Sequence, residues 1–243
     1  MKKKIISILV IFSIILLIVF ARIFIFLPPQ ENPSGLLLSF DDYSPENWEA
    51  YFDLFDKYDA NVTFFINSFD ITEPTDFCYK AVERGHEIGF HTKYHNSLVD
   101  ADEEEIYQEA IEPIELFRNA GFPLTTFAYP YGDYTDPLNQ QLLQYYKVLR
   151  GGWHYQLNSK ENLKSGLVEA RCLDNANFES DLRFKLSVNK MLYETRWQEG
   201  TVVALYSHSI ENGEWCITPE RLEYVLKRAK QLGLEFYTFE ELQ

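Results

Sequence analysis

Two pairs of side chains in this sequence could bind a metal ion, and both follow short apolar runs. Asp41 and Asp42 come directly after residues 36–40, and His91 and His95 follow a second run. If the chain coils after that second run, positions i and i+4 share one face, so the two imidazoles could hold one ion. With one carboxylate they would form a three-ligand set of the kind that catalytic zinc uses, with a position open for water or substrate.

A third apolar run, residues 201–206, ends at Ser207 and His208. Taken singly, an aspartate pair after a strand is more typical of turn chemistry, and a histidine pair is more often solvent-facing or satisfied in a core. Three such strand ends together favour one shared site. His86 precedes its strand and is expected at the opposite rim, and His154 lacks a comparable setting, so neither receives a role.

Strand-like and helix-like segments alternate along the chain after the aspartate pair, which predicts parallel strands joined by helices. Because every candidate residue follows a strand, we expect the chemistry at the C-terminal rim of an α/β fold of the β/α-barrel type. The later strands are expected at 62–66, 87–90, 125–128, 148–150, 201–206 and 235–237, and the helices at 47–56, 76–84, 102–119, 137–146, 182–198 and 219–232. Residues 167–173 form a further short apolar stretch.

Four short motifs occur in a fixed order. Residues 39–43 read S-F-D-D-Y, residues 91–95 read H-T-K-Y-H, residues 128–131 read A-Y-P-Y, and residues 205–208 read L-Y-S-H. These motifs resemble the T-F-D-D-G, H-[ST]-x-x-H, R-x-P-[YF] and leucine-histidine motifs of the polysaccharide deacetylases, of carbohydrate esterase family 4 type, and the order agrees over residues 35–240. The resemblance implies a distorted (β/α) barrel of about seven strands.

The resemblance also implies the chemistry. A divalent ion would polarise an acetamide carbonyl and acidify water, so that a nearby carboxylate can take a proton, and an imidazole suits protonation of the departing amine. We therefore expect a metal-dependent N-deacetylase, a hydrolase of non-peptide carbon–nitrogen bonds in an aminosugar polymer of the cell wall or extracellular matrix. The alternatives are an O-acetyl esterase on a wall polymer and a catalytically silent carbohydrate-binding module. By this resemblance Asp41 is the base, His208 is the acid, and the backbone N–H of Tyr131 is an oxyanion donor. The metal ligands are Asp42, His91 and His95, and the ion is zinc, or alternatively cobalt, nickel or manganese.

Two positions depart from the family motifs. Tyr43 stands where the family has glycine, which is incompatible with a turn that needs positive φ there and could place an aromatic wall beside the site. Ala128 stands where the family has the arginine that orients the base. Arg171 or Arg150 could replace that arginine, and we favour Arg171, although a surface arginine is an equal alternative for either.

Aromatic side chains near the motifs could contact sugar rings. Trp153 and Tyr131 are the candidate platforms, with core packing as the alternative, and Pro130 is a candidate support residue beside Tyr131. The chain has 16 tyrosines, 19 phenylalanines and 4 tryptophans, so most aromatics must pack in the core. The other three tryptophans receive no role.

The first 27 residues predict a membrane-inserting helix. Three lysines at positions 2–4 precede the apolar run 5–21, and residues 23–27 extend it if Arg22 reaches the interface. We favour a retained single-pass anchor over a cleaved secretion signal, because no small-x-small cleavage site follows the run. The lysines would keep the N-terminus in the cytoplasm and place the rest of the chain outside it.

One catalytic domain is expected after the membrane-inserting segment. It spans residues 35–243, follows a linker at residues 28–34, and is expected to be a monomer.

The exported part of the chain is strongly acidic. Four basic and no acidic residues precede Glu31, so the net charge of −15 becomes −15 − 4 = −19 for the exported part. Nucleic acid is therefore a poor partner, and the acidity serves solubility or attraction of a cationic polymer. The three cysteines, at positions 78, 172 and 216, permit at most one intramolecular disulfide and require none.

Overall fold

The structure is a computed structural model that describes residues 29–67, 73–152, 155–159 and 163–242. The predicted membrane-inserting segment 1–27 and the candidate sugar platform Trp153 lie outside the described residues. Within the described ranges, no helix combines the length and the apolar character that crossing a bilayer requires.

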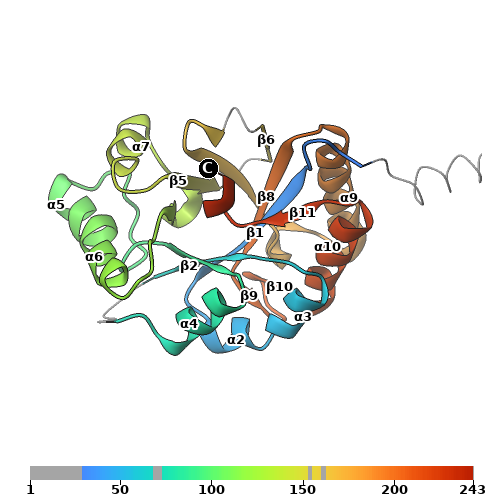
Figure 1. The fold of residues 1–243 in the computed structure, drawn as a ribbon, viewed down its shortest axis with the longest axis horizontal. Coiled ribbons are helices and arrows are strands. Elements are labelled where there is room, and N and C mark those ends of the chain that lie inside the picture. Colours follow the sequence, from blue (N-terminus) through green and yellow to red (C-terminus); the bar gives the residue numbers. More distant parts are fainter. Residues whose placement is uncertain (1–28, 68–72, 153–154, 160–162, 243) are drawn as a thin grey trace, which may run out of the picture.

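Within the described residues, seven parallel strands close into a barrel with helices on its outside (Figure 1). The last of them pairs with the first over Gly35–Phe40, which completes the ring. The predicted barrel of about seven strands is confirmed. The strands follow one another around the barrel as β1 (Gly35–Asp42), β2 (Thr63–Ile66), β3 (Glu87–Phe90), β4 (Thr126–Ala128), β5 (Val148–Gly152), β7 (Leu167–Cys172) and β8 (Thr201–Ser207).

The barrel is distorted where a further strand joins it. β11 (Glu235–Tyr237) pairs with the first half of β1, whereas β2 pairs with the second half. β6 (Leu157–Ser159) runs antiparallel to β8, and β9 (Ser209–Ile210) pairs with β10 (Cys216–Ile217). Except for β7, where buried and partly buried residues alternate, the barrel strands are buried nearly throughout, as expected for parallel strands covered by helices on the outside and by side chains within.

The helices match the predicted segments with two differences in continuity, and the helix predicted at 137–146 ends four residues early, at Leu142. The segment predicted at 47–56 is broken into α2 and α3, and the segment predicted at 102–119 contains the π-turn η1 (Tyr107–Ile111) between α5 and α6. Pro113 accounts for the second difference, because it lacks the N–H that a regular helix needs. The helices are α2 (Pro45–Glu49), α3 (Phe52–Lys57), α4 (Asp76–Glu83), α5 (Glu103–Ile106), α6 (Glu112–Asn119), α7 (Asp136–Leu142), α9 (Asp181–Trp197) and α10 (Pro219–Gln231).

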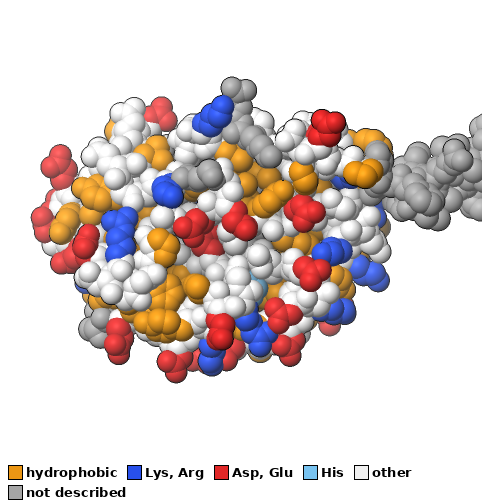
Figure 2. Space-filling model, viewed as in Figure 1, with side chains coloured by type: hydrophobic (Ala, Val, Ile, Leu, Met, Phe, Trp, Pro, Cys, Tyr) orange, Lys and Arg blue, Asp and Glu red, His pale blue; other side chains and the backbone are white. Residues whose placement is uncertain are grey.

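Acidic and basic side chains are interspersed over the face shown in Figure 2. Surface charge of mixed sign and negative excess favours solubility. The charge pattern of this face therefore fits the solubility interpretation of the acidic composition.

Candidate active site

The candidate side chains meet where the sequence places them, at the carboxyl ends of the barrel strands. β1 ends in the aspartate pair, His91 follows β3, and His208 follows β8. Parallel strands bring these ends to one rim. One cavity of about 570 Å³ at this rim is lined, among others, by Asp41, Asp42, His91, His95 and His208.

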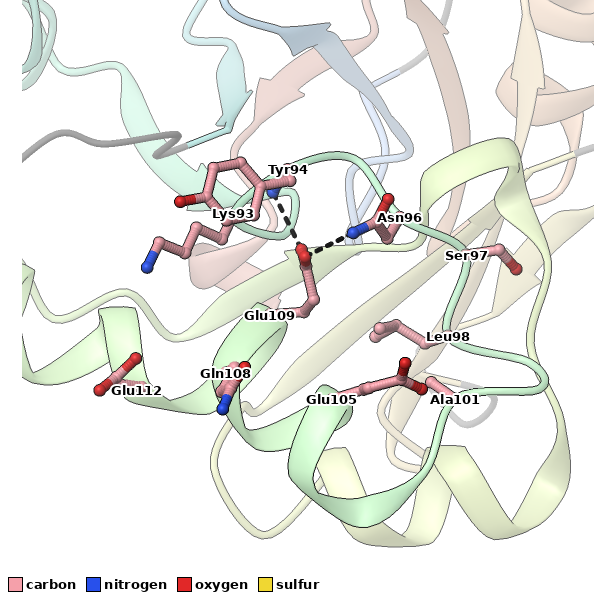
Figure 3. A pocket seen from close by; sticks show the side chains of 10 residues that line it. All are labelled: Lys93, Tyr94, Asn96, Ser97, Leu98, Ala101, Glu105, Gln108, Glu109 and Glu112. Atoms are coloured by element: carbon pink, nitrogen blue, oxygen red, sulfur yellow. Dashed lines mark hydrogen bonds between the residues drawn. The ribbon is translucent and has the colours of Figure 1, made fainter.

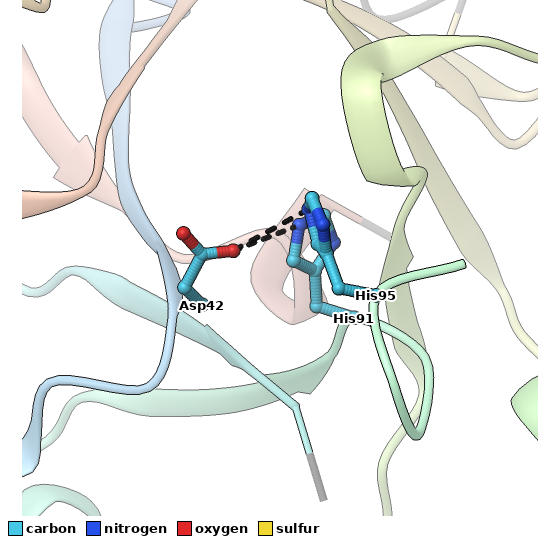
Figure 4. Close-up of side chains that lie close together, drawn as sticks. All are labelled: Asp42, His91 and His95. Atoms are coloured by element: carbon cyan, nitrogen blue, oxygen red, sulfur yellow. Dashed lines mark ion pairs between the residues drawn. The ribbon is translucent and has the colours of Figure 1, made fainter. Parts of the chain in front are cut away.

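Asp42, His91 and His95 form a group that could hold a cation (Figure 4). Oδ1 of Asp42 lies 3.6 Å from Nε2 of His91 and 3.4 Å from Nε2 of His95. This oxygen is buried and has no hydrogen-bond partner among the described residues. Nδ1 of His91 lies 2.7 Å from the carbonyl oxygen of Ala128, which favours the tautomer whose Nε2 lone pair faces Asp42.

Both imidazoles have the protonation state that a ligand needs. Burial lowers the pKa of His91 well below its ordinary value, with Arg150 adding to the effect, and burial also lowers the pKa of His95. Neutral imidazoles and an unpartnered carboxylate oxygen fit a divalent cation.

A loop, not a helical turn, follows β3 and brings the two histidines together, so they meet without the helical i, i+4 geometry considered from the sequence. Thr92 and His95 have φ of 64° and 61°, and these left-handed residues fold the loop back until the imidazole centroids are 4.9 Å apart. The side-chain amide of Asn67 donates to the carbonyl oxygen of His91 at 2.5 Å and holds the start of the loop. In the first motif the positive φ falls on Asp42, at 77°, and not on Tyr43.

Asp41 is buried against an arginine. Nη2 of Arg150 donates to Oδ2 of Asp41 at 2.5 Å, and the guanidinium lies 4.2 Å from the ring centroid of Tyr206. Oδ1 of Asp41 has no hydrogen-bond partner among the described residues. Burial raises the pKa of Asp41 to about 6, even though Arg150 acts in the opposite direction.

His208 is held by a carboxylate that sequence reasoning missed. Nδ1 of His208 lies 2.6 Å from Oδ2 of Asp174, and the Ser207 hydroxyl donates to Oδ1 of the same carboxylate at 2.5 Å. The indole N–H of Trp48 donates to the carbonyl oxygen of His208 at 2.9 Å. Burial alone would lower the pKa of His208, but Asp174 and the aspartates across the cavity raise it to about 9. The signal for Asp174 was its position just after the short apolar stretch 167–173.

Cys172 lies beside this pair, and the ligand atoms of Cys172, Asp174 and His208 are within 4.8 Å of one another. Burial raises the pKa of the Cys172 thiol to about 12, so the thiolate that a metal needs is disfavoured at neutral pH. The group around Asp42 is therefore the better cation site.

A model of the polysaccharide deacetylase family matches residues 29–147, which contain the aspartate pair, both loop histidines and the third motif. The chain belongs to the polysaccharide deacetylase family. The resemblance inferred from the motifs is thereby confirmed.

Individual members of the family extend this result. The peptidoglycan-N-acetylglucosamine deacetylase PgdA of Listeria monocytogenes is 22% identical over 217 residues, which are 88% of this chain and 40% of that protein. The chain therefore spans about 40% of the length of the curated relatives it matches.

Two solved structures show the same fold. The chitin deacetylase of the fungal pathogen Colletotrichum lindemuthianum has a TM-score of 0.62 and 17% identity, over 89% of this chain and 90% of that one. A family 4 acetyl xylan esterase from Clostridium thermocellum, in complex with a cobalt ion, has a TM-score of 0.58 and 19% identity, over 85% of this chain and 89% of that one.

In this chain an arginine on a neighbouring strand takes the place of the arginine that the third motif lacks. Ala128 on β4 is the register partner of Arg150 on β5, so Arg150 starts at the same height of the barrel and reaches Asp41. The preference for Arg171 is therefore wrong: Arg171 lines the cavity, but the guanidinium that contacts Asp41 belongs to Arg150.

The aromatic expectations have mixed outcomes. Tyr131 lines the cavity, 53% exposed, and its ring packs edge-on against His95 with centroids 4.7 Å apart. Pro130 is buried at the start of the turn η2 (Pro130–Gly132). Tyr43 does not line the cavity, so the expected aromatic wall is wrong: the hydroxyl of Tyr43 donates to Thr75 at 3.2 Å, and its ring packs on the core.

Trp215 lines the cavity instead, although no pattern in the sequence indicated a role for it. Its side chain is 68% exposed. The loop that carries it is tied down, because the Asn175 amide donates to the carbonyl oxygen of Gly213 at 2.7 Å. An exposed indole on a fixed loop at the mouth of the cavity is a suitable sugar-binding surface.

Proposed function

We propose that this chain is a metal-dependent hydrolase that removes N-acetyl groups from an aminosugar polymer of the cell wall or extracellular matrix. The observation that carries the proposal is the single cavity that holds a three-ligand cation set, a buried carboxylate paired with arginine, and an imidazole paired with a carboxylate. The names of the relatives, a peptidoglycan-N-acetylglucosamine deacetylase and a chitin deacetylase, support this substrate class.

Asp42, His91 and His95 would hold the ion, with zinc as our choice and cobalt, nickel or manganese as alternatives. When bound, the ion would supply Lewis-acid polarisation of the acetamide carbonyl and of water. These residues keep one carboxylate oxygen and two neutral imidazole nitrogens directed at a common point.

Asp41 is the proposed base. Arg150 holds Oδ2, which leaves Oδ1 available to take a proton from the attacking water. With a pKa of about 6, this carboxyl is mostly ionised at neutral pH and yet basic enough to accept a proton during the reaction. Oδ1 therefore meets both requirements of a general base.

His208 is the proposed acid. With a pKa of about 9 it is protonated at neutral pH, and Asp174 holds the Nδ1 proton. The Nε2 proton then remains for the amine nitrogen as the carbon–nitrogen bond breaks, so the products are acetate and a free amine. We assign the role of oxyanion donor to the backbone N–H of Tyr131, a residue that lines the cavity beside His95.

Acetate release tests this function. Full-length protein loaded with zinc or cobalt should release acetate from N-acetylglucosamine oligomers or peptidoglycan. Asp41→Asn should abolish the release and still bind metal, because the ligand set is intact. Activity that survives Asp41→Asn would contradict the assigned base.

The same assay separates the alternatives. Release from an O-acetylated polymer alone would indicate an esterase, and the acetyl xylan esterase among the structural neighbours makes that substrate a necessary comparison. Stoichiometric metal without acetate release from any substrate would indicate a silent carbohydrate-binding module. The Arg150 contact argues against that module, because it supplies the guanidinium that Ala128 lacks.

We also propose that residues 1–27 are a retained single-pass anchor that leaves residues 35–243 outside the cytoplasm. The support is the apolar sequence of that segment and its preceding lysines. Protease added to intact cells should degrade the domain, and carbonate washing should leave the chain in the membrane fraction. A processed chain in the medium would indicate secretion.

A further inference from the structure

A cavity of about 620 Å³ lies beside the loop that carries His95, between that loop and the helical segment 103–119 (Figure 3). Three carboxylates line it, and they differ in burial. Glu105 and Glu112 are exposed, whereas Glu109 is 7% exposed. The mechanism above uses none of them, so the burial of Glu109 needs its own explanation.

Glu109 makes three hydrogen bonds to the loop. Its backbone carbonyl accepts from the backbone N–H of Lys93 at 2.9 Å. Its carboxylate accepts from the backbone N–H of Tyr94 at 2.9 Å and from the side-chain amide of Asn96 at 2.7 Å (Figure 3). These contacts are made immediately before and immediately after His95.

The helix is built to make these bonds. In a regular helix the Glu109 carbonyl would accept from residue 113, but Pro113 has no N–H to donate. The chain forms the π-turn η1 just before this proline, with the N–H of Glu112 bonded to the carbonyl of Tyr107. The Glu109 carbonyl is thus released from the helix and accepts from Lys93 instead. π-turns of this kind often occur at functional sites.

His91 and His95 depend on different supports. His91 follows β3 directly, and its imidazole is fixed by the Ala128 carbonyl. His95 lies in the loop with φ of 61°, a conformation that needs support from the surrounding structure. We propose that Glu109 is a positioning residue that holds His95 in its metal-binding geometry. The inference rests on the proposed metal site.

Removal and restoration of the Glu109 acceptor test the proposal. In Glu109→Leu, the Tyr94 N–H and the Asn96 amide both lose their acceptor. In Glu109→Gln, the new side-chain oxygen can accept from the Tyr94 N–H, and the new amide can donate to Oδ1 of Asn96 once the Asn96 amide turns over, so hydrogen bonding is restored without the charge. Glu112→Leu, the same change on an exposed neighbour, is the matched control.

Each variant is measured as full-length protein, by zinc titration against a chelating dye and by the visible spectrum of the cobalt form. We expect Glu109→Leu to weaken zinc binding by about tenfold or more and to alter the cobalt spectrum, as is typical when the support of a ligand is removed. Glu109→Gln should keep most of the wild-type affinity, and Glu112→Leu should match wild type. The unfolding midpoint of the metal-free protein identifies a variant that does not fold.

Wild-type affinity and spectrum in Glu109→Leu would overturn the inference, as would a folded Glu109→Gln that binds zinc no better than Glu109→Leu. If Glu109→Leu does not fold, Asn96→Ala takes its place, since it removes one of the three bonds. Unchanged affinity in that variant would also overturn the inference. A wild-type protein that binds no zinc would overturn the metal site itself, and the same titration distinguishes that result.

Discussion

Replacing Asp174 by asparagine should shift the alkaline side of the pH–activity profile to lower pH. The asparagine can keep both hydrogen bonds, with its oxygen accepting from Nδ1 of His208 and its amide donating to the Ser207 hydroxyl. The variant therefore removes a negative charge and little else. Any change in the profile then reports on the charge.

The magnitude follows from the pKa of His208. Asp174 contributes to raising it from 6.5 to about 9, against the opposing effect of burial. Without that charge we expect the pKa to return to about 6.5 or below. The protonated fraction of His208 at pH 8 then falls from about 0.9 to about 0.03, so activity should drop about 30-fold at pH 8 and less than about twofold at pH 6.

The assay is acetate release from one N-acetylglucosamine oligomer between pH 5 and 10, with both proteins loaded with the same metal. A bound cation would lower the pKa of His208 in both proteins, so the comparison is the displacement between the two profiles. Ser207→Ala, which removes a hydrogen bond but leaves the charge of Asp174, should keep its alkaline limb near that of wild type. An unshifted limb in Asp174→Asn would refute the assignment of His208 as an acid tuned by Asp174.

Three further predictions concern other parts of the domain. Arg150→Ala leaves the buried Asp41 carboxylate unpaired, so it should abolish activity and lower the free energy of unfolding of the metal-free protein by about 3–5 kcal/mol. Arg171→Ala is the control and should lower that free energy by about 1 kcal/mol or less, with both values measured by urea unfolding. Trp215→Ala should raise KM for long oligomers more than for the disaccharide while leaving metal binding unchanged, and equal KM changes would exclude a sugar-binding role. Burial lowers the pKa of His86 to about 4, so the unfolded chain binds the His86 proton more tightly than the folded protein does. The effect of His86 on the free energy of unfolding should therefore be constant above about pH 6.5 and should lower that free energy by about 3 kcal/mol at pH 4. His86→Leu should remove this pH dependence from urea unfolding measured between about pH 4 and 7.

The strands and the rim could be predicted because their signal is local. β3 was predicted with its observed bounds, since a short apolar run between turn residues reports burial directly. The helix interruptions were harder. Pro113 is visible in the sequence, but whether it would end the helix, bend it or produce a π-turn depends on the loop that accepts the released carbonyl.

The partners of the proposed catalytic side chains could not be predicted to the same degree. Choosing between Arg150 and Arg171 required the register of β5 against β4, and register depends on pairing between segments that are distant in sequence. Asp174 escaped notice because a single aspartate after a strand has no motif around it. Its proximity to His208 results from the pairing of β7 with β8.

The sequence by itself determined which side chains gather at one rim, because strand-and-helix alternation fixes the end of the barrel at which each residue emerges. It also determined the family, through motifs that are short and ordered. Only the tertiary structure decided which arginine faces Asp41, which carboxylate raises the pKa of His208, and how a loop with left-handed residues brings His95 to Asp42. These are contacts of a few ångströms across strands and loops, and a pattern along one chain does not specify them.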